Sequence, residues 1–527
     1  MVFPYFCIRV LNSIMIYNPQ VVLLVAVIFN ILAVVVVVGI LEKRNKLRRE
    51  AFIAQVYNVK GLTYFPKFCS NRAILGYVVT LIAVSAIFLQ RALPFQFMVF
   101  GLASVLIFFM GSNRLTKNWY RFPPKKFTKK LFTTALIIRV VYVIFIYFYY
   151  IAMTGEPHEF FAGDALLYQE MASLWQLYGM DAFLQQMHAH IGFSDAGYCW
   201  WLAIEYRVLG THVLPARLLK CVIDSFTCVL LYDLAERNFG EAAGRMAGIF
   251  YMLNFNVWFY CGVTLKEIEM VFILILFLER ADMVLRSPKI KIKDMMLPLM
   301  CIIIMFAFRT ALAAVMFAAL AGALILTTSK QLQLWKKILY SAVFTVWMYL
   351  AVGVEIVQET QQLWAGRTEN QEVGYQWRAE SEQGNTFAKY ATASVFAPLI
   401  FTIPFSSMVH VSWQENQMMM NGANFTKNIM SGFTIFALFL LLFRGDWRKH
   451  VLPLAVMCGY LVVLAFSNFA HSERFHFPVL GLELMFAAFG VTQMANKHKR
   501  WFSIWVVGIC IANILWALIK LRGRGLA

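Results

Sequence analysis

Long apolar runs recur throughout this 527-residue chain, and they constrain its fold more than any other feature. Many reach roughly 17–22 residues, enough for a helix to cross the ~30 Å hydrocarbon core of a bilayer. Of all residues, 61% are hydrophobic and 14% are charged, whereas a soluble domain carries about a quarter charged residues. The strict alternation of apolar and polar residues that marks barrel strands is absent. The sequence therefore predicts an all-α polytopic membrane protein.

We expect about 13–14 transmembrane helices, because each sufficiently long apolar run is read as one helix. The boundaries are set by the charged and turn-forming residues that interrupt the apolar pattern. The predicted spans lie near residues 20–41, 73–90, 94–111, 131–152, 213–234, 242–261, 266–283, 293–309, 310–327, 336–356, 427–443, 451–467, 476–493 and 501–519.

The net charge of +19 follows the positive-inside rule rather than a nucleic-acid-binding pattern. Basic residues gather at alternate ends of the spans, as in residues 43–49, 114–130 and 286–293. We assign these ends to the cytoplasm. The first span lacks a basic leader and a small-residue cleavage site, so it is predicted to be an uncleaved anchor with its N-terminus outside. The partner indicated by the charge is the lipid bilayer, not nucleic acid.

Three parts are expected along the chain. Residues 1–130 form an accessory N-terminal transmembrane bundle, residues 131–495 a second domain marked by polar residues, and residues 496–527 a C-terminal helix with a basic tail. Two long loops, 153–212 and 357–426, fall on the extracytoplasmic side. Helical spacing of apolar residues over 165–178 and 200–209 predicts interfacial helices in the first loop. Prolines interrupt the stretch 391–409 in the second, which predicts a re-entrant or interfacial segment.

Asp164 is the most informative residue of the first loop. It follows Gly163 shortly after an apolar run ends, so it lies where a helix meets water. A carboxylate at that place can act as the general base for an acceptor hydroxyl. The alternative is structural, since Asp at a helix start caps backbone N–H groups and suits the helix dipole.

Lys266, Glu267 and Arg309 lie between apolar runs on the predicted outer side. Lys266 would bind a substrate phosphate, and Glu267 would be a second acid or a ligand for a divalent cation. The alternative for this pair is a solvated hairpin turn. Arg309 is placed at a turn or facing a cavity, because an arginine facing lipid costs at least ~2.5 kcal/mol. Snorkelling to the outer headgroups is the alternative for Arg309.

Arg217 and Arg474 complete the set of predicted anion-binding residues. Arg217 lies near the surface end of its span, and Arg474 can fork onto phosphate oxygens. Lys220 and Asp224 are four residues apart on the same span, where a structural ion pair is at least as plausible as a site. Because the notable charges map to one membrane face, they predict a cavity at the outer leaflet for an anionic, lipid-linked substrate.

Several short motifs resemble the GT-C class of lipid-carrier-dependent glycosyltransferases. The similarity is to glycosyltransferase family 39 and the aminoarabinose-transferase-like proteins, which are related to protein O-mannosyltransferases. It covers about residues 131–495. The motifs are Gly163-Asp164-Ala-Leu-Leu-Tyr168, Trp201 to Gly210, Leu214-Pro-Ala-Arg217, Val229 to Gly240, Gly240 to Gly248, Leu265-Lys-Glu267 and Arg474 to Pro478.

The resemblance implies a polyprenyl-phosphate sugar donor and transfer with inversion on the extracytoplasmic face. Asp164 falls where the family keeps its catalytic acid, Tyr168 closes the same motif as a substrate-binding residue, and Arg474 falls near the lipid-phosphate contacts. Many members carry a second acid directly after the first, but here Ala165 follows, so Glu267 is the candidate partner. A divalent cation is the one cofactor suggested.

We therefore expect a hexosyl- or pentosyltransferase of the bacterial inner membrane whose active site faces the periplasm or exterior. Its acceptor is a glycan, a lipid or a protein. One alternative is an O-antigen-type polysaccharide polymerase that uses a lipid pyrophosphate-linked oligosaccharide. A second is a transporter or flippase, which would place polar sites near the bilayer midplane beside broken helices.

Overall fold

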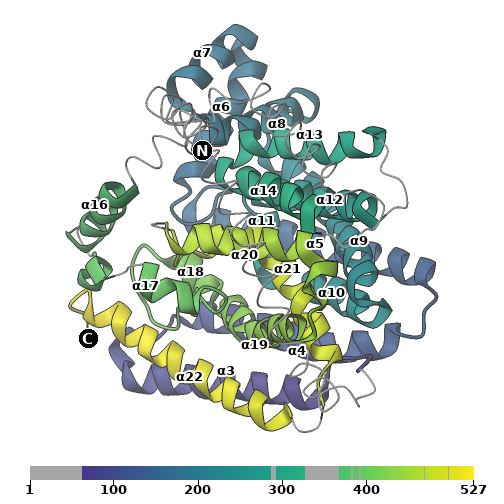
Figure 1. Ribbon diagram of the computed structural model, residues 1–527. Coiled ribbons are helices and arrows are strands. Elements are labelled where there is room, and N and C mark those ends of the chain that lie inside the picture. The colour runs from purple at the N-terminus through teal and green to yellow at the C-terminus, as the bar shows by residue number, and fades with distance from the viewer. Residues whose placement is uncertain are drawn as a thin grey trace, which may run out of the picture.

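The computed structural model describes residues 62–286, 292–326, 367–380, 384–390, 393–467, 469–495 and 498–526. These residues form helices joined by turns, with no strand among them (Figure 1). Seven described helical segments are long and apolar enough to cross a membrane, and the chain is an all-α, multi-pass membrane protein. They are α3 (Lys67–Ile87), α4 (Phe95–Trp119), α5 (Pro124–Thr154), α19 (Asn421–Arg444), Asp446–Ala465 with α20 (Val451–Ala465), α21 (Glu473–Thr492) and α22 (His498–Arg522).

Four further helices coincide with predicted spans but are more polar or shorter. They are α9 (Val213–Phe239), α12 (Glu267–Arg286), α13 (Ile292–Phe308) and α14 (Thr310–Leu326). The predicted spans near 20–41 and 336–356 lie outside the described residues. The total of 13–14 spans therefore stays a prediction.

The predicted span 242–261 is wrong as a single helix. The chain forms α10 (Glu241–Leu253) and α11 (Phe255–Cys261), with a break at Asn254. Asn254 is extended, and its side-chain oxygen accepts a hydrogen bond from the Asn256 backbone N–H. This is the N-cap chemistry that starts a new helix. The apolar run continues across the break, so hydropathy does not reveal it.

The first loop contains three helices that lie together at one end of the molecule (Figure 1). Two were predicted, α6 (Gly163–Tyr178) and α8 (Phe193–Leu209), and α6 packs against α8. The third, α7 (Met180–His190), was missed. The rings of Trp175, Phe183 and Trp200 hold the three helices together, with Phe183 and Trp200 edge to face at 4.9 Å.

The described part of the second loop contains α16 (Arg367–Glu380), α17 (Ala393–Phe396) and α18 (Glu415–Met419). α19 begins at Asn421, within the stretch 357–426 that the sequence assigned to the loop. Asn421 is fully buried, donates to the Phe97 carbonyl at 2.9 Å and accepts from the Tyr77 hydroxyl at 2.6 Å. These hydrogen bonds compensate for the burial of the polar Asn421 side chain, which the sequence assigns to a loop.

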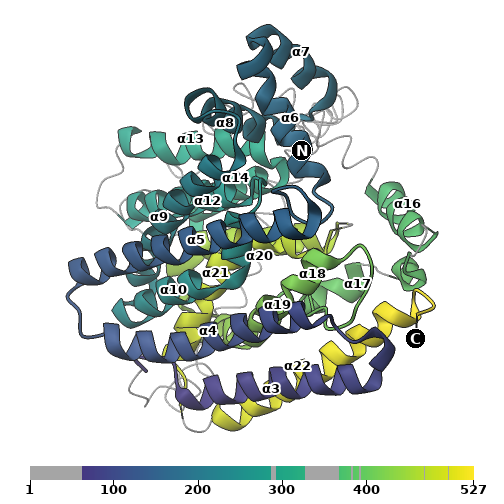
Figure 2. The same cartoon turned by 180° about the vertical axis from the view of Figure 1, so that it is seen from behind.

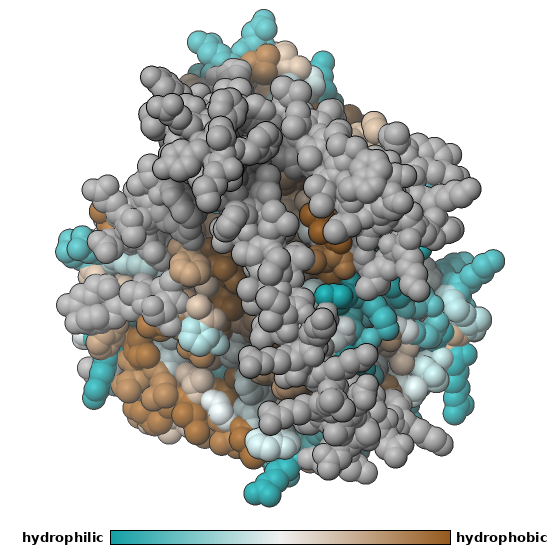
Figure 3. All heavy atoms as spheres, in the orientation of Figure 1, coloured by the Kyte–Doolittle hydropathy of each residue, from teal (hydrophilic) through white to brown (hydrophobic). Residues whose placement is uncertain are grey.

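Helices α3 and α4 pack against α22, α19 and α10, as the reverse view shows (Figure 2). Residues 67–119 are thus joined to the rest of the bundle, and the division at residue 130 stays a prediction. One face of α22 exposes apolar residues at helical spacing: Ile504, Val507, Ile511, Leu515 and Ile519. Apolar side chains gather over α22 and α3 at the lower left of Figure 3. Such a face suits contact with lipid tails.

Candidate functional site

The short segment between α11 and α12 is the point on which the polar side chains converge. From α9, Arg217 donates to the Thr264 hydroxyl at 3.3 and 3.1 Å through two of its nitrogens. Lys220 donates to the carbonyls of Val263, at 3.2 Å, and Leu265. These bonds fix an irregular backbone inside the bundle, where its carbonyls have no water to bind.

Lys266 and Glu267 are buried at the end of this segment, with residue exposures of 4% and 0%. The solvated hairpin turn is therefore wrong. The turn is covered because α8, α13 and α21 each contribute a polar contact to it.

Arg474, in the first turn of α21, joins two carboxylates that are distant in the sequence. Its Nε donates to Glu267 Oε1 at 2.5 Å, and its Nη1 donates to Asp164 Oδ2. These partners are 207 and 310 residues away along the chain. Arg309 Nη2 lies 3.7 Å from the same Glu267 oxygen. Four of the predicted residues are thus brought to one point from four separate elements.

Asp164 does not cap its helix. The N-cap position of α6 is Ala162, and no side chain bonds the first-turn N–H groups there. Asp164 instead lies in the first turn, where its charge suits the helix dipole. Its side chain is 58% exposed even though it pairs with Arg474. It is the most exposed carboxylate of the group.

Arg309 occupies the turn between α13 and α14, as predicted. It donates to the Tyr460 hydroxyl at 3.1 Å, and its guanidinium carbon lies 4.4 Å from the Phe475 ring centroid. That geometry is a cation–π contact. Because the residue is 9% exposed, the snorkelling alternative is wrong.

Asp195 is a central residue that the sequence interpretation missed. Lys266 Nζ donates to its carboxylate, to the Ser194 carbonyl at 2.7 Å and to the Phe308 carbonyl at 2.5 Å. The Tyr168 hydroxyl donates to Asp195 Oδ1 at 2.7 Å. Burial would raise the pKa of Asp195, but Lys266 and Tyr168 hold it below its usual value. Asp195 is therefore ionised at neutral pH.

Asp195 lies in the first turn of α8, as Asp164 lies in the first turn of α6. The helix predicted over 200–209 begins after Asp195, so the predicted bounds do not include it. We call the connected set the Arg474 cluster, which consists of Asp164, Tyr168, Asp195, Lys266, Glu267, Arg309 and Arg474.

Arg217 lies deeper than predicted. Its side chain is fully buried, and its Nη1 has no hydrogen-bond partner within the described residues. Burial raises the pKa of the nearby Glu159, although Arg217 opposes this shift. Arg217 holds the Thr264 segment and does not face the surface.

The ion pair considered as one alternative for Lys220 and Asp224 does not form. Lys220 Nζ lies 3.5 Å from Glu269, whereas Asp224 accepts from Arg139 and, at 2.6 Å, from the Tyr251 hydroxyl. The sequence contains a signal for this pairing at Arg139, since an arginine within the apolar run 131–152 needs a buried partner.

Within the described residues, no three His, Cys, Asp or Glu side chains gather as metal ligands. The described residues therefore offer no set of ligands for a divalent cation at Glu267, whose carboxylate is held by Arg474 and Arg309.

No protein-family model matches this sequence, and no curated protein matches it either. Functional assignment therefore depends on the chemistry of the Arg474 cluster.

Proposed function

We propose that the protein is an integral-membrane glycosyltransferase of the bacterial inner membrane. It transfers a sugar from a polyprenyl-phosphate-linked donor to a glycan, lipid or protein acceptor on the extracytoplasmic face. The observation that carries this proposal is the convergence of an exposed carboxylate, Asp164, with the buried cations Arg309 and Lys266 around Arg474. Such a group can bind a phosphate and activate a hydroxyl side by side.

In the proposed reaction an acceptor hydroxyl attacks the anomeric carbon of the donor sugar. The bond from that carbon to the phosphate oxygen breaks with inversion, and polyprenyl phosphate leaves with the electron pair. Asp164 takes the proton of the hydroxyl. The leaving phosphate needs no strong acid, because guanidinium and ammonium groups stabilise its charge.

The contact between Arg474 and Asp164 supports an order of events. The charged side chains of the Arg474 cluster comprise three cations and three carboxylates, so an entering phosphate must compete for Arg474. A phosphate that takes over Arg474 Nη1 releases Asp164 as a free base. Donor binding thereby prepares the base for the acceptor.

Glu267 is better suited to a positioning role than to proton transfer. Its side chain is fully buried, and one oxygen receives Arg474 at 2.5 Å with Arg309 at 3.7 Å. A carboxylate held in this way fixes the guanidinium of Arg474, which also contacts Asp164.

Asp164→Asn tests the proposal. Transfer of labelled sugar from polyprenyl-phosphate donors, measured in membranes that contain the full chain, is expected to fall about 10²–10⁴-fold, because the base is lost. Asp181→Asn is the matched control, since Asp181 also lies in the first turn of an exposed helix of this loop, α7. Wild-type transfer rates in Asp164→Asn would exclude Asp164 as the base.

One observation favours the second candidate, a transporter or flippase. The helix break at Asn254 lies between two halves of a predicted span, a feature of transporter sites. A flipping assay with a fluorescent polyprenyl-phosphate lipid in vesicles separates the two functions. Lipid translocation without sugar transfer would favour the transporter over the glycosyltransferase.

A further inference from the structure

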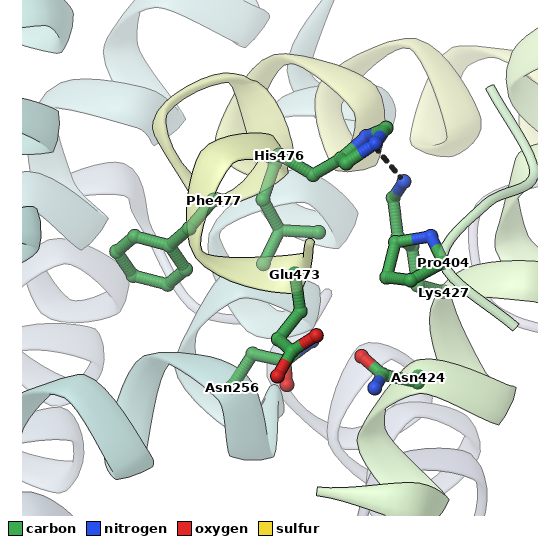
Figure 4. A pocket seen from close by; sticks show the side chains of 8 residues that line it. Asn256, Pro404, Asn424, Lys427, Glu473, His476 and Phe477 are labelled. Atoms are coloured by element: carbon green, nitrogen blue, oxygen red, sulfur yellow. Dashed lines mark hydrogen bonds between the residues drawn. The ribbon is translucent and has the colours of Figure 1, made fainter. Parts of the chain in front are cut away.

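A small cavity lies between α11, α19 and α21 (Figure 4). It has room for about one water molecule. That water can donate to the amide oxygens of Asn256 and Asn424, neither of which has a partner among the described residues. A sugar ring is too large to enter this cavity. The sugar of the proposed donor is therefore recognised elsewhere.

Asp195, in the Arg474 cluster, combines a fixed position with an open oxygen. Lys266 and the Tyr168 hydroxyl both donate to its Oδ1, the hydroxyl at 2.7 Å. Both donors are buried, so they fix the direction of the carboxylate. Its Oδ2 accepts no hydrogen bond from any described residue, and the side chain is 37% exposed. Asp195 thus presents one oriented acceptor to a ligand.

Asp195 also lies close to Asp164 and Arg474. Tyr168 follows Asp164 by one helical turn on the same face of α6, and it donates to Asp195. Arg474 contacts Asp164, and its charge also stabilises the ionised form of Asp195. A substrate that binds Arg474 therefore meets two exposed carboxylates, each with one oxygen that accepts no bond from the described residues.

The free oxygen of Asp195 suits a hydroxyl group and disfavours an anion. An ionised carboxylate only accepts hydrogen bonds, and it repels phosphates and other carboxylates. The phosphate of the donor therefore binds at the cations. The sugar is joined to that phosphate by one oxygen atom, so a hydroxyl of its ring can reach Asp195 while Asp164 serves the acceptor.

The charges of the cluster leave no cation for an acidic sugar. Its three cations already face three carboxylates, and a bound phosphate diester adds one more negative charge. We propose that Asp195 selects the donor sugar, with Oδ2 accepting a hydrogen bond from a hydroxyl of a neutral hexose or pentose, and that sugars carrying a carboxylate are rejected. This inference rests on the proposed function, because it uses the phosphate of the same donor.

The test measures binding to the full chain in detergent without an acceptor, so it does not depend on transfer. The probes are polyprenyl phosphate, polyprenyl-phosphate glucose and polyprenyl-phosphate glucuronic acid, and thermal-shift titration gives the affinity for each. Wild type is expected to bind the glucose lipid about tenfold more tightly than the glucuronic acid lipid, because like charges are juxtaposed in the second complex.

Equal affinities for the two sugar lipids, or tighter binding of the glucuronic acid lipid, would overturn the selection by Asp195. If none of the three lipids bound, the proposed function would fail, and this inference would fail with it. The two failures are therefore distinguishable.

Asp195→Asn keeps the oxygen that accepts from Lys266 and Tyr168 and replaces the free oxygen by an amide donor. Since an amide donates to a carboxylate, the preference for the glucose lipid is expected to fall below about twofold. Asp181→Asn, in the first turn of α7, is the matched control and keeps the wild-type preference.

Tyr168→Phe is the second variant, in case Asp195→Asn does not fold. It removes one of the two donors that fix Asp195, so the preference is expected to fall to about threefold. A preference as large as that of wild type in either folded variant would mean that Asp195 does not select the sugar.

Discussion

The two ends of α12 carry ionic clusters built from the same chemistry for different purposes. At its start lies the Arg474 cluster. At its other end, roughly 30 Å away for a helix of 20 residues, lies a second group that we call the Asp282 cluster. It consists of Arg237, Asn238, Glu279, Asp282, Arg286 and His450.

The carboxylates of the Asp282 cluster are enclosed by their partners. Arg237 reaches Glu279 at 2.6 Å and Asp282 at 3.4 Å, while Arg286 donates to Asp282 at 2.9 Å. The side chains of both acids are 5% exposed.

In the Arg474 cluster, Asp164 is 58% exposed and has one cationic partner. Pairing alone therefore does not define a site. A carboxylate closed in by arginines clamps helices, whereas one left open beside an arginine can meet a substrate.

The largest expected effect that separates the two clusters is on activity. Arg474→Gln is expected to reduce sugar transfer about 10²–10³-fold, because a donor aimed at the leaving phosphate is lost. Arg237→Gln is the matched control and is expected to lower Tm while folded protein keeps its activity. Sugar-transfer rates divided by the amount of folded protein measure this difference. If both variants lost the same activity per folded molecule, the two clusters would not differ in function.

Much of the scaffold could be predicted, because apolar runs and the charges that end them are local features. Asp164, Glu267, Arg309 and Arg474 were placed at one face since each lies at the end of a run, and the structure brings these four together. Their partnership is not local, because it joins α6, α12 and α21 with the α13–α14 turn. The membrane topology predicts that these four residues lie close together, but it does not predict which side chains pair.

The rest could not be predicted because it depends on burial and on competition for partners. Lys220 and Asp224 share a helix face but do not pair with each other. Lys220 instead donates to a backbone carbonyl beside Thr264, and Asp224 pairs with Arg139. The Asn254 break rests on one side-chain hydrogen bond within an unbroken apolar run. Asp195 precedes the helix predicted over 200–209, and its role depends on Lys266, which is buried beside it.

Glu205 allows a pH-dependent test of stability at the end of α12 where the Arg474 cluster lies. Burial, together with the nearby Glu269, raises its pKa from 4.5 to about 8. Its partner is the Trp201 ring N–H at 2.6 Å, not an arginine. The stability gained from protonated Glu205 is full below about pH 4.5 and is lost as pH rises through about 8.

Glu205→Gln should therefore match wild type near pH 5 and exceed it in Tm at pH 8–9, with a gap of several degrees that levels off above pH 8. Thermal unfolding between these pH values measures the gap. Glu170→Gln, an exposed acid of α6, should show no such trend. A constant gap at all pH values would mean that Glu205 is not the titrating group.

The smallest expected effect concerns backbone strain. Beside the Asp282 cluster, the residues with positive φ are glycines, Gly240 at 87° and Gly445 at 74°. Near Asp164 the same backbone region is occupied by Phe161 and Trp413, at φ of 54° and 66°, with ring centroids 4.6 Å apart. A residue with a Cβ pays about 1–2 kcal/mol in this conformation, whereas glycine does not.

Trp413→Gly is therefore expected to be more stable than Trp413→Ala by about 1 kcal/mol, because both remove the ring and glycine also relieves the strain. At Glu170, inside α6, the order should reverse, since glycine costs about 1 kcal/mol relative to alanine in a helix. Denaturant or thermal unfolding of the four variants measures both differences. If alanine were the more stable replacement at residue 413 as well, the strain at the Asp164 end would not exist and the two ends would not differ in this respect.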